Sequence, residues 1–205
     1  MIRPDFDKCI KLANDLLFKQ SFISTRLDVT TLIFSKKIYF FSIQEYCEAT
    51  DTKLTDFISK ANQCLVDGCT IKYGEFYFIL HNDKPQCKEH LNWTRAHEIG
   101  HIYLNHNKDE DLEEVEAHFF AAQLLMPEYT LRQASSHFKL DCSTIMDVFG
   151  VSEEAALKRM NTLSKKWFFN PSAKDKYIWL NHKKDIELYS YCLEQDLSFA
   201  DIVNR

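Results

Sequence analysis

The stretch His97-Glu98-Ile99-Gly100-His101 decides how this chain is interpreted. Two histidines four positions apart on a helix lie roughly 40° apart around its axis, so both imidazoles can reach one metal ion. Glu98 lies about 100° round the helix from His97, where its carboxylate can face a water molecule on that ion. This HExxH spacing is the arrangement of zinc peptidases, in which the glutamate is the general base. The pattern predicts a metal site with His97 and His101 as ligands and Glu98 as the base.

The alternative is a helix that carries two histidines without a metal. The surrounding sequence argues against it, because an apolar stripe places the histidines beside a packed face. The stripe comprises Leu91, Ala96, Ile99, Ile102 and Tyr103. We expect this helix to begin near Asn92 and to end at about His106.

A catalytic zinc takes three protein ligands and keeps one position for water. One known spacing places a glycine three residues and a histidine six residues after the second histidine. Leu104 and Asn107 stand at those two places, which excludes that solution. His106 lies roughly 140° round the helix from His101 and cannot easily share the ion. The third ligand is therefore expected from the helix that follows.

Three glutamates open that next helix, which is predicted from Leu112 to Met126. We expect Glu116 to be the third ligand, because Ala117 beside it leaves room for close packing of two helices. Glu113, one turn earlier, is the alternative, whereas Glu114 is expected to point largely away from both. All three can also be explained as acids favoured by the dipole at a helix N-terminus.

Length and composition indicate a globular protein. The chain has 205 residues, enough for one good core and a small appended unit, and 45% of them are hydrophobic. The net charge of −5 gives no strong overall electrostatic case for binding nucleic acid. The sequence shows neither a secretory signal at its start nor a run of about 20 apolar residues. Its seven cysteines include no CxxC pair, so we expect reduced thiols and a cytoplasmic location rather than a cysteine-rich zinc site.

Periodicity predicts the elements before the HExxH helix. A helix is expected over Asp5 to Lys19 and a second helix between Thr50 and Gly68. Residues 27–41 are expected to form one or two strands, or a strand and a loop. Residues 69–80 predict a hairpin that turns at Gly74-Glu75. Its second strand is either an edge strand, able to pair with an extended substrate backbone, or an inner strand of the sheet.

Two blocks of sequence resemble the ImmA/IrrE family of metallopeptidases. The first runs from His97 to His106, and the second from Glu114 to Pro127 ends in Leu-Leu-Met-Pro. The resemblance covers about residues 65–165. It implies an α+β fold with a zincin-like domain (gluzincin-like, with glutamate as third ligand), a small sheet and an active-site helix. Members typically act on helix-turn-helix transcriptional repressors. The chain departs from the family at His118, where Asn or Asp is usual, and at Arg95; His118 could orient a ligand or compete for the metal.

The region after the site is predicted to be mainly helical. We expect a zincin-like domain over residues 1–130, a helix-turn-helix-like region over 131–166 and a C-terminal extension of unassigned role over 167–205. In the second region, helices flank Phe149-Gly150-Val151-Ser152 and resemble a helix-turn-helix. Lys158, Arg159, Lys165 and Lys166 offer some charge for DNA, although packing or docking of a repressor is favoured over direct DNA binding. In the extension, a strand at 177–180 and a helix at 186–193 are expected.

The function that follows is a zinc-dependent endopeptidase of a protein substrate, and the resemblance implies a helix-turn-helix repressor as that substrate. Glu98 would take a proton from the attacking water and deliver it to the leaving amine. Tyr73, Tyr129 and His137 are candidates for the group that stabilises the oxyanion. The same types of ligand also suit manganese or iron. The competing hypotheses are a non-catalytic zincin fold that binds a repressor or DNA, and a peptidase that acts on a toxin–antitoxin pair.

Overall fold

The computed structural model describes residues 3–60, 62–82, 87–107, 111–163 and 170–203. It is an α+β structure with a small sheet and many helices, as predicted. The strands are β1 (Lys37–Ser42), β2 (Gly68–Tyr73) and β3 (Phe76–His81). The helices are α1 (Phe6–Phe18), α2 (Ile43–Thr50), α3 (Lys88–Leu104), α4 (Asp111–Leu125), α5 (Glu128–Ala134), α6 (Cys142–Phe149), α7 (Glu153–Leu163), α8 (Ala173–Glu194) and α9 (Phe199–Val203), with short 3-10 helices η1 (Val29–Thr31) and η2 (Leu54–Phe57).

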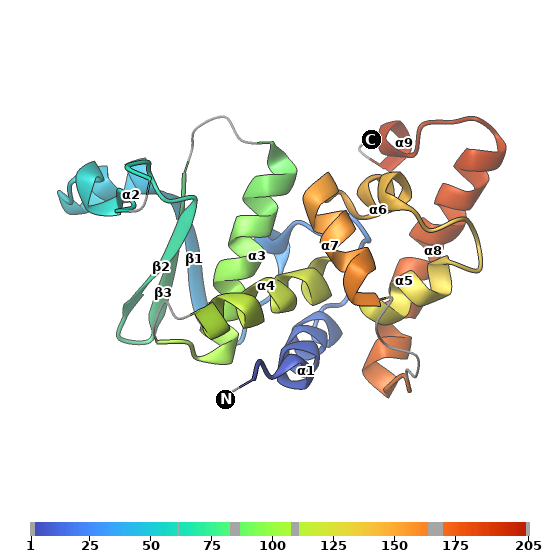
Figure 1. Cartoon of the computed structure of the whole chain (residues 1–205), viewed down its shortest axis with the longest axis horizontal. Helices are drawn as coiled ribbons and strands as arrows, with labels where there is room; N and C mark the ends of the chain where they lie inside the picture. Colours follow the sequence, from blue (N-terminus) through green and yellow to red (C-terminus); the bar gives the residue numbers. More distant parts are fainter. Residues whose placement is uncertain (1–2, 61, 83–86, 108–110, 164–169, 204–205) are drawn as a thin grey trace.

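The sheet stands at one end of the molecule and the last five helices gather at the other (Figure 1). Its strand order is β1-β3-β2, with β1 parallel and β2 antiparallel to β3. Gly74 adopts a φ of 59° at the hairpin turn, a conformation that glycine reaches without a Cβ clash. The question left open by the sequence is answered here: β3 is the inner strand of the described sheet, and β1 and β2 are its edge strands.

Helices α3 and α4 cross next to the sheet, and α1 packs along α4 (Figure 1). Helix α1 confirms the prediction for residues 5–19, with Asp5 as its N-cap: the Asp5 side chain accepts a hydrogen bond from the Lys8 amide. The helices predicted on either side of Gly150 are also present as α6 and α7. Within the described ranges, none of the helices combines the length and the apolar character that a membrane crossing requires.

The helix predicted between Thr50 and Gly68 is wrong. The helix of this region, α2, lies earlier and is followed by η2 and a bridge between Ile58 and Leu65. Its start is set by a capping box, in which the Ser42 side chain accepts from the Glu45 amide while the Glu45 carboxylate accepts from the Ser42 amide. The Ser-x-x-Glu pattern is a signature of a helix start, but it was not used to predict α2.

The strand predicted at residues 177–180 is wrong, because one helix of 22 residues, α8, covers them. The helix predicted at 186–193 is confirmed as the C-terminal part of α8. Ser172 and Asp175 form a capping box at its start. Its buried positions recur at helical spacing at Ile178, His182, Ile186 and Tyr189. The tail is thus part of the packed structure rather than a loose extension.

A buried polar network joins helices that are far apart in the sequence. The Asn14 amide of α1 donates to Asp175 of α8 at 2.8 Å, and Gln123 of α4 donates to Asn14 at 2.9 Å. Arg159 of α7, 1% exposed, donates to the Met126 carbonyl at 2.9 Å and to Gln123 Oε1 at 2.5 Å. The guanidinium that the sequence offered to DNA therefore lies inside the protein, whereas Lys165 and Lys166 lie outside the described residues.

We expect Arg159→Met to lower the free energy of unfolding by about 3 kcal/mol. The change removes the donor from the Met126 carbonyl oxygen and leaves Gln123 Oε1 with only the Glu128 amide, at 3.3 Å. A buried acceptor left unpaired costs about 1–3 kcal/mol. Urea unfolding followed by circular dichroism measures the effect. Lys158→Met on the exposed side of the same helix is the matched control and should alter stability by less than about 0.5 kcal/mol. Equal stability of the two variants would contradict the role given to the network.

His182 makes stability depend on pH. Burial lowers its pKa from 6.5 to about 4, outweighing the opposing effects of Asp185 and a hydrogen bond with the Ser24 backbone. The unfolded chain then binds the proton first, so stability is complete above about pH 6.5 and is lost as pH falls towards 4. Between pH 7 and 4.5 the loss amounts to about 2–3 kcal/mol. Urea unfolding at both pH values should show that His182→Gln removes this part of the difference; an unchanged pH dependence would contradict the assignment.

Candidate metal centre

The site forms where α3 packs closely against two other elements, helix α4 and strand β2. Helices α3 and α4 cross at Gly100, where a Cβ atom would lie 3.1 Å from the Ala117 carbonyl oxygen and 3.2 Å from its Cα. The small residue that the sequence analysis expected at this crossing is thus Ala117 on one side, with Gly100 on the other. At Gly68 on β2, a Cβ atom would lie 2.5 Å from Thr94 Cγ2, so the edge strand runs directly against α3. The HExxH residues therefore face both α4 and β2.

Three donor groups converge between α3 and α4. The Nε2 atoms of His97 and His101 lie 2.9 Å apart. The two carboxylate oxygens of Glu114 lie 3.3 Å from these atoms, one oxygen against each ring. Donors that share a tetrahedral zinc at about 2.0–2.1 Å lie about 3.3 Å from one another. The chemistry and spacing of this donor set therefore fit a divalent metal ion.

The electrostatics of Glu114 fit the same picture. Its side chain is partly exposed, yet the hydrogen bond with His97 and then the charges of His97, His101 and His118 lower its pKa to about 2. The carboxylate is therefore ionised at every pH at which the protein would work, as a metal ligand must be.

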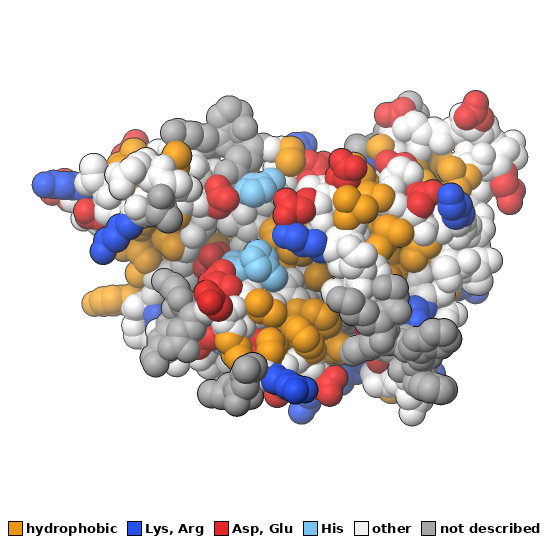
Figure 2. Space-filling view, viewed as in Figure 1, with side chains coloured by type: hydrophobic (Ala, Val, Ile, Leu, Met, Phe, Trp, Pro, Cys, Tyr) orange, Lys and Arg blue, Asp and Glu red, His pale blue; other side chains and the backbone are white. Residues whose placement is uncertain are grey.

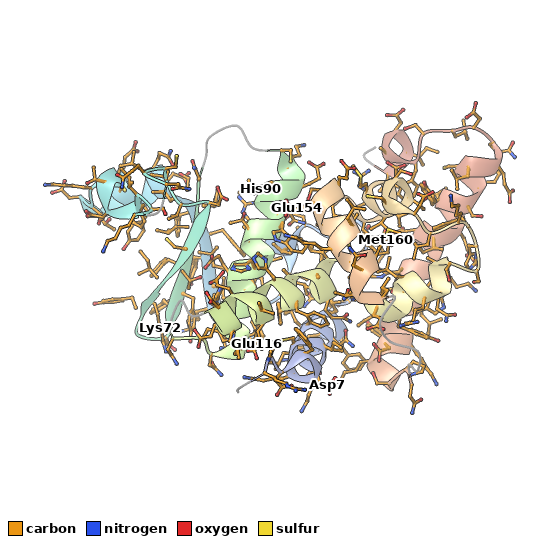
Figure 3. All side chains as sticks on the ribbon, viewed as in Figure 1. Asp7, Lys72, His90, Glu116, Glu154 and Met160 are labelled. Carbon is orange, nitrogen blue, oxygen red and sulfur yellow. The ribbon has the colours of Figure 1, made fainter. Side chains whose placement is uncertain are left out.

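Glu116 does not occupy the place predicted for it. Its buried carboxylate faces α1, where Oε1 accepts a hydrogen bond from the Asp5 amide at 2.7 Å (Figure 3). Its Oε2 lies 3.1 Å from His106 Nε2, and His106 Nδ1 lies 3.1 Å from His101 Nδ1. Glu116 thus reaches the metal donors only through His106. Positions 114 and 116 are about 200° apart around a helix, so only one of them can face His97 and His101.

Glu113, the alternative ligand, lies near the loop before α4, where its carboxylate accepts a hydrogen bond from the Asn107 amide at 3.4 Å. Glu114 was expected to point away from the site. It faces His97 and His101 instead, because α4 is turned about its own axis by a different amount than expected. The rotation is set by packing: Ala117, Phe120, Ala121 and Leu124 are buried, which fixes Glu114 on the face that meets α3. His106, expected not to share the ion, lies behind His101 and can hold that ring in one orientation.

Glu98 lies beside the donors and is almost fully buried, at 8% exposure. Its Oε2 accepts a hydrogen bond from the Thr70 hydroxyl of β2 at 2.7 Å. The edge strand therefore fixes the orientation of the carboxylate that the sequence predicts to be the base. Thr70 was not singled out in the sequence, and a lone threonine in a strand carries no signal that could have found it.

A cleft of about 880 Å³ opens over these groups, between the edge strand β2 and helix α7. Figure 2 shows histidines exposed at the middle of this face with acidic and basic side chains around them. The α7 side presents Glu154 and Lys158, which form an ion pair at 2.6 Å. The cleft is thus open to solvent and is bounded by a strand edge on one side and charged groups on the other.

The three groups suggested for oxyanion stabilisation are not among the described residues that line this cleft. Tyr73 lies at the hairpin and is 76% exposed. Tyr129 is on α5, and the ring of His137 lies 6.0 Å from that of Trp179, remote from the donors. Those predictions are wrong in placement. The lining instead includes Tyr77, Trp93 and His118.

Besides His106, the structure brings His118 close to the donors. It follows Glu114 by one helical turn, and its ring centroid lies 4.4 Å from that of His97. Partial burial of its ring, followed by the charge of His97, lowers its pKa below 6.5, which favours the neutral imidazole.

Comparison with protein families supports this picture. A model of a peptidase family, described as the IrrE N-terminal-like domain, matches residues 51–161, more than half of the chain. The match contains β2, β3, α3 and α4, which together hold every donor described above. A comparison with curated proteins finds no match.

Proposed function

Since the chain belongs to the IrrE N-terminal-like family of peptidases, we propose that it is a zinc-dependent endopeptidase. One observation carries the proposal: two imidazole nitrogens and a carboxylate lie within 3.3 Å of one another at the floor of an open cleft, with a second, buried carboxylate beside them. Three donors with an accessible fourth position are the arrangement of catalytic zinc sites.

We assign His97, His101 and Glu114 as the ligands, in place of the earlier choice of Glu116. His106 and Glu116 orient the His101 ring from behind, in the way that hydrogen-bonded carboxylates commonly support metal-binding histidines. A zinc ion held by this set would supply a Lewis acid that polarises the scissile carbonyl and acidifies water. Manganese and iron suit the same donor types and are the alternatives for the metal.

Glu98 does the proton chemistry in this proposal. Its carboxylate accepts a proton from water as that water attacks the carbonyl carbon, and then passes the proton to the leaving amine nitrogen. The Thr70 hydroxyl holds one carboxylate oxygen at 2.7 Å, which fixes the orientation of a carboxylate that lines the cleft. A fixed base loses less entropy on reaching the transition state than a mobile one.

The exposed edge of strand β2 is evidence that the substrate is a polypeptide. Its outer side has no neighbouring strand in the described sheet, and it lines the cleft from Gly68 to Lys72. An extended peptide can add to such an edge through backbone hydrogen bonds, which brings a peptide bond past the donors. The resemblance of the HExxH and Leu-Leu-Met-Pro blocks suggests a helix-turn-helix repressor as the substrate, and hence a role in transcription regulation.

The charged groups of α7 favour docking of a repressor protein over direct binding of DNA. Arg159 is buried and Lys158 is paired with Glu154, so neither cation of this helix presents an unpaired charge to a DNA backbone. A phosphate contact needs exposed positive charge. No disulfide joins the seven cysteines, all of which are described, and such thiols suit a reducing compartment such as the cytoplasm.

The test is incubation of the purified, zinc-loaded protein with a helix-turn-helix repressor encoded beside its own gene. We expect shorter repressor fragments by mass spectrometry, with one defined new terminus. The chelator-treated protein is the control and should leave the repressor intact. A repressor that co-purifies with the protein but stays intact would replace the peptidase by a regulatory binder.

A further inference from the structure

Helices α3 and α4 face one another with a pair of metal-binding side chains each. On α3 the pair is His97 and His101, and on α4 it is Glu114 and His118, again four positions apart. Residues at this spacing lie on one helical face. We propose that His118 is a fourth protein ligand of the metal centre; this rests on the proposed function.

Geometry places His118 within reach of the ion. Donor atoms of His97, Glu114 and His118 all lie within 4.8 Å of one another. Donors that share a tetrahedral zinc lie about 3.3 Å apart, so binding requires a small rotation of the His118 side chain towards the other donors. This motion is open to it, because the ring lies at the cleft surface and is exposed.

Neighbouring rings keep His118 close to the donors. Its ring is stacked with Trp93 of α3, with centroids 6.3 Å apart, and is tilted against His97 at 4.4 Å. On the far side lie the charged groups of α7, Glu154 and Lys158, which neutralise one another as an ion pair. The aromatic contacts hold the ring over the cleft, and imidazole is a preferred ligand for zinc.

A fourth protein ligand would close the metal centre when no substrate is bound. With His97, His101, Glu114 and His118 bound, the protein supplies four ligands and leaves no tetrahedral position for water. Structural zinc sites are closed in this way, and catalytic sites are not. His118 would then have to leave the ion before a substrate carbonyl could approach. The ring of Trp93, which already stacks on His118, can contact the released imidazole.

Proton NMR of the cobalt-loaded full chain tests the proposal. Cobalt is paramagnetic and shifts the ring N–H protons of each bound histidine far from the ordinary range, so these signals count histidine ligands. We expect three shifted ring signals in the wild type, two in His118→Asn and three in the control His137→Asn, which lies outside the cleft. His118→Asn should also bind zinc at least about tenfold more weakly in chelator competition, the smallest loss usual when metal-site partners are removed.

The outcomes separate the two proposals. Two shifted signals in the wild type, with zinc affinity unchanged in His118→Asn, would overturn the fourth ligand and leave the peptidase standing. No shifted signals and no stoichiometric metal in the wild type would end both. If His118→Asn fails to fold, as judged by circular dichroism, the wild-type signal count still decides, and His118→Gln supplies the second variant.

Discussion

Glu98→Gln will bind zinc as the wild type does and will cleave substrate at least about 100-fold more slowly, because general acid–base catalysis contributes about 10²–10⁴-fold to rate. The amide has the shape of the carboxylate but cannot accept a proton from water. The side-chain oxygen can still accept from the Thr70 hydroxyl, so the buried contact at 2.7 Å survives and the fold is kept.

The measurement is the initial rate of repressor cleavage, together with metal content by mass spectrometry of the purified variant. Glu75→Gln is the matched control: it makes the same chemical change at the hairpin, where Glu75 pairs with Lys37 outside the cleft. It should cleave at the wild-type rate. Cleavage by Glu98→Gln at that same rate would remove Glu98 from the role of base.

The second large effect distinguishes the two glutamates of α4. Glu114→Gln should lose more than about 100-fold in zinc affinity, since it removes a ligand, whereas outer partners of ligands cost about 10–100-fold. Glu116→Gln should fall within that lower range, because Glu116 acts through His106. The affinities are measured by competition with a chelator of known strength.

Glu113→Gln serves as the control for this pair, since its carboxylate lies against the Asn107 amide. It should leave zinc affinity unchanged. If Glu116→Gln loses the metal while Glu114→Gln keeps it, the ligand assignment reverses and the rotation of α4 derived from its buried face is not the one that binds metal.

The sequence predicted what depends on short spacings. The pair His97 and His101 and the neighbouring Glu98 occupy one helix, and helical geometry alone fixes where three such side chains lie relative to one another. The hairpin followed from Gly74 between two aromatic runs. The same reasoning found α1 and the two helices around Gly150, because each is bounded by a local cap or turn.

Local reasoning failed where two signals competed. Residues 50–68 have helical spacing of apolar residues, yet η2 and the Ile58–Leu65 bridge form there. The helix of this region starts earlier, at the capping box of Ser42, and ends where Asp51 adopts a left-handed conformation. Residues 177–180 have the composition of a strand, but they continue a helix whose buried face runs on to Tyr189. Tertiary burial overrides strand propensity in that segment.

The sequence alone specified two histidines four positions apart with a carboxylate between them, a second helix that follows with acids at its start, and a hairpin that precedes both. Only the tertiary structure decided which acid turns towards the histidines. The choice between Glu114 and Glu116 depends on how α4 rotates against α3, and that rotation is set by Ala117 against Gly100 and by the side chains that α4 buries. Such contacts join residues distant in the chain, so no local spacing contains them.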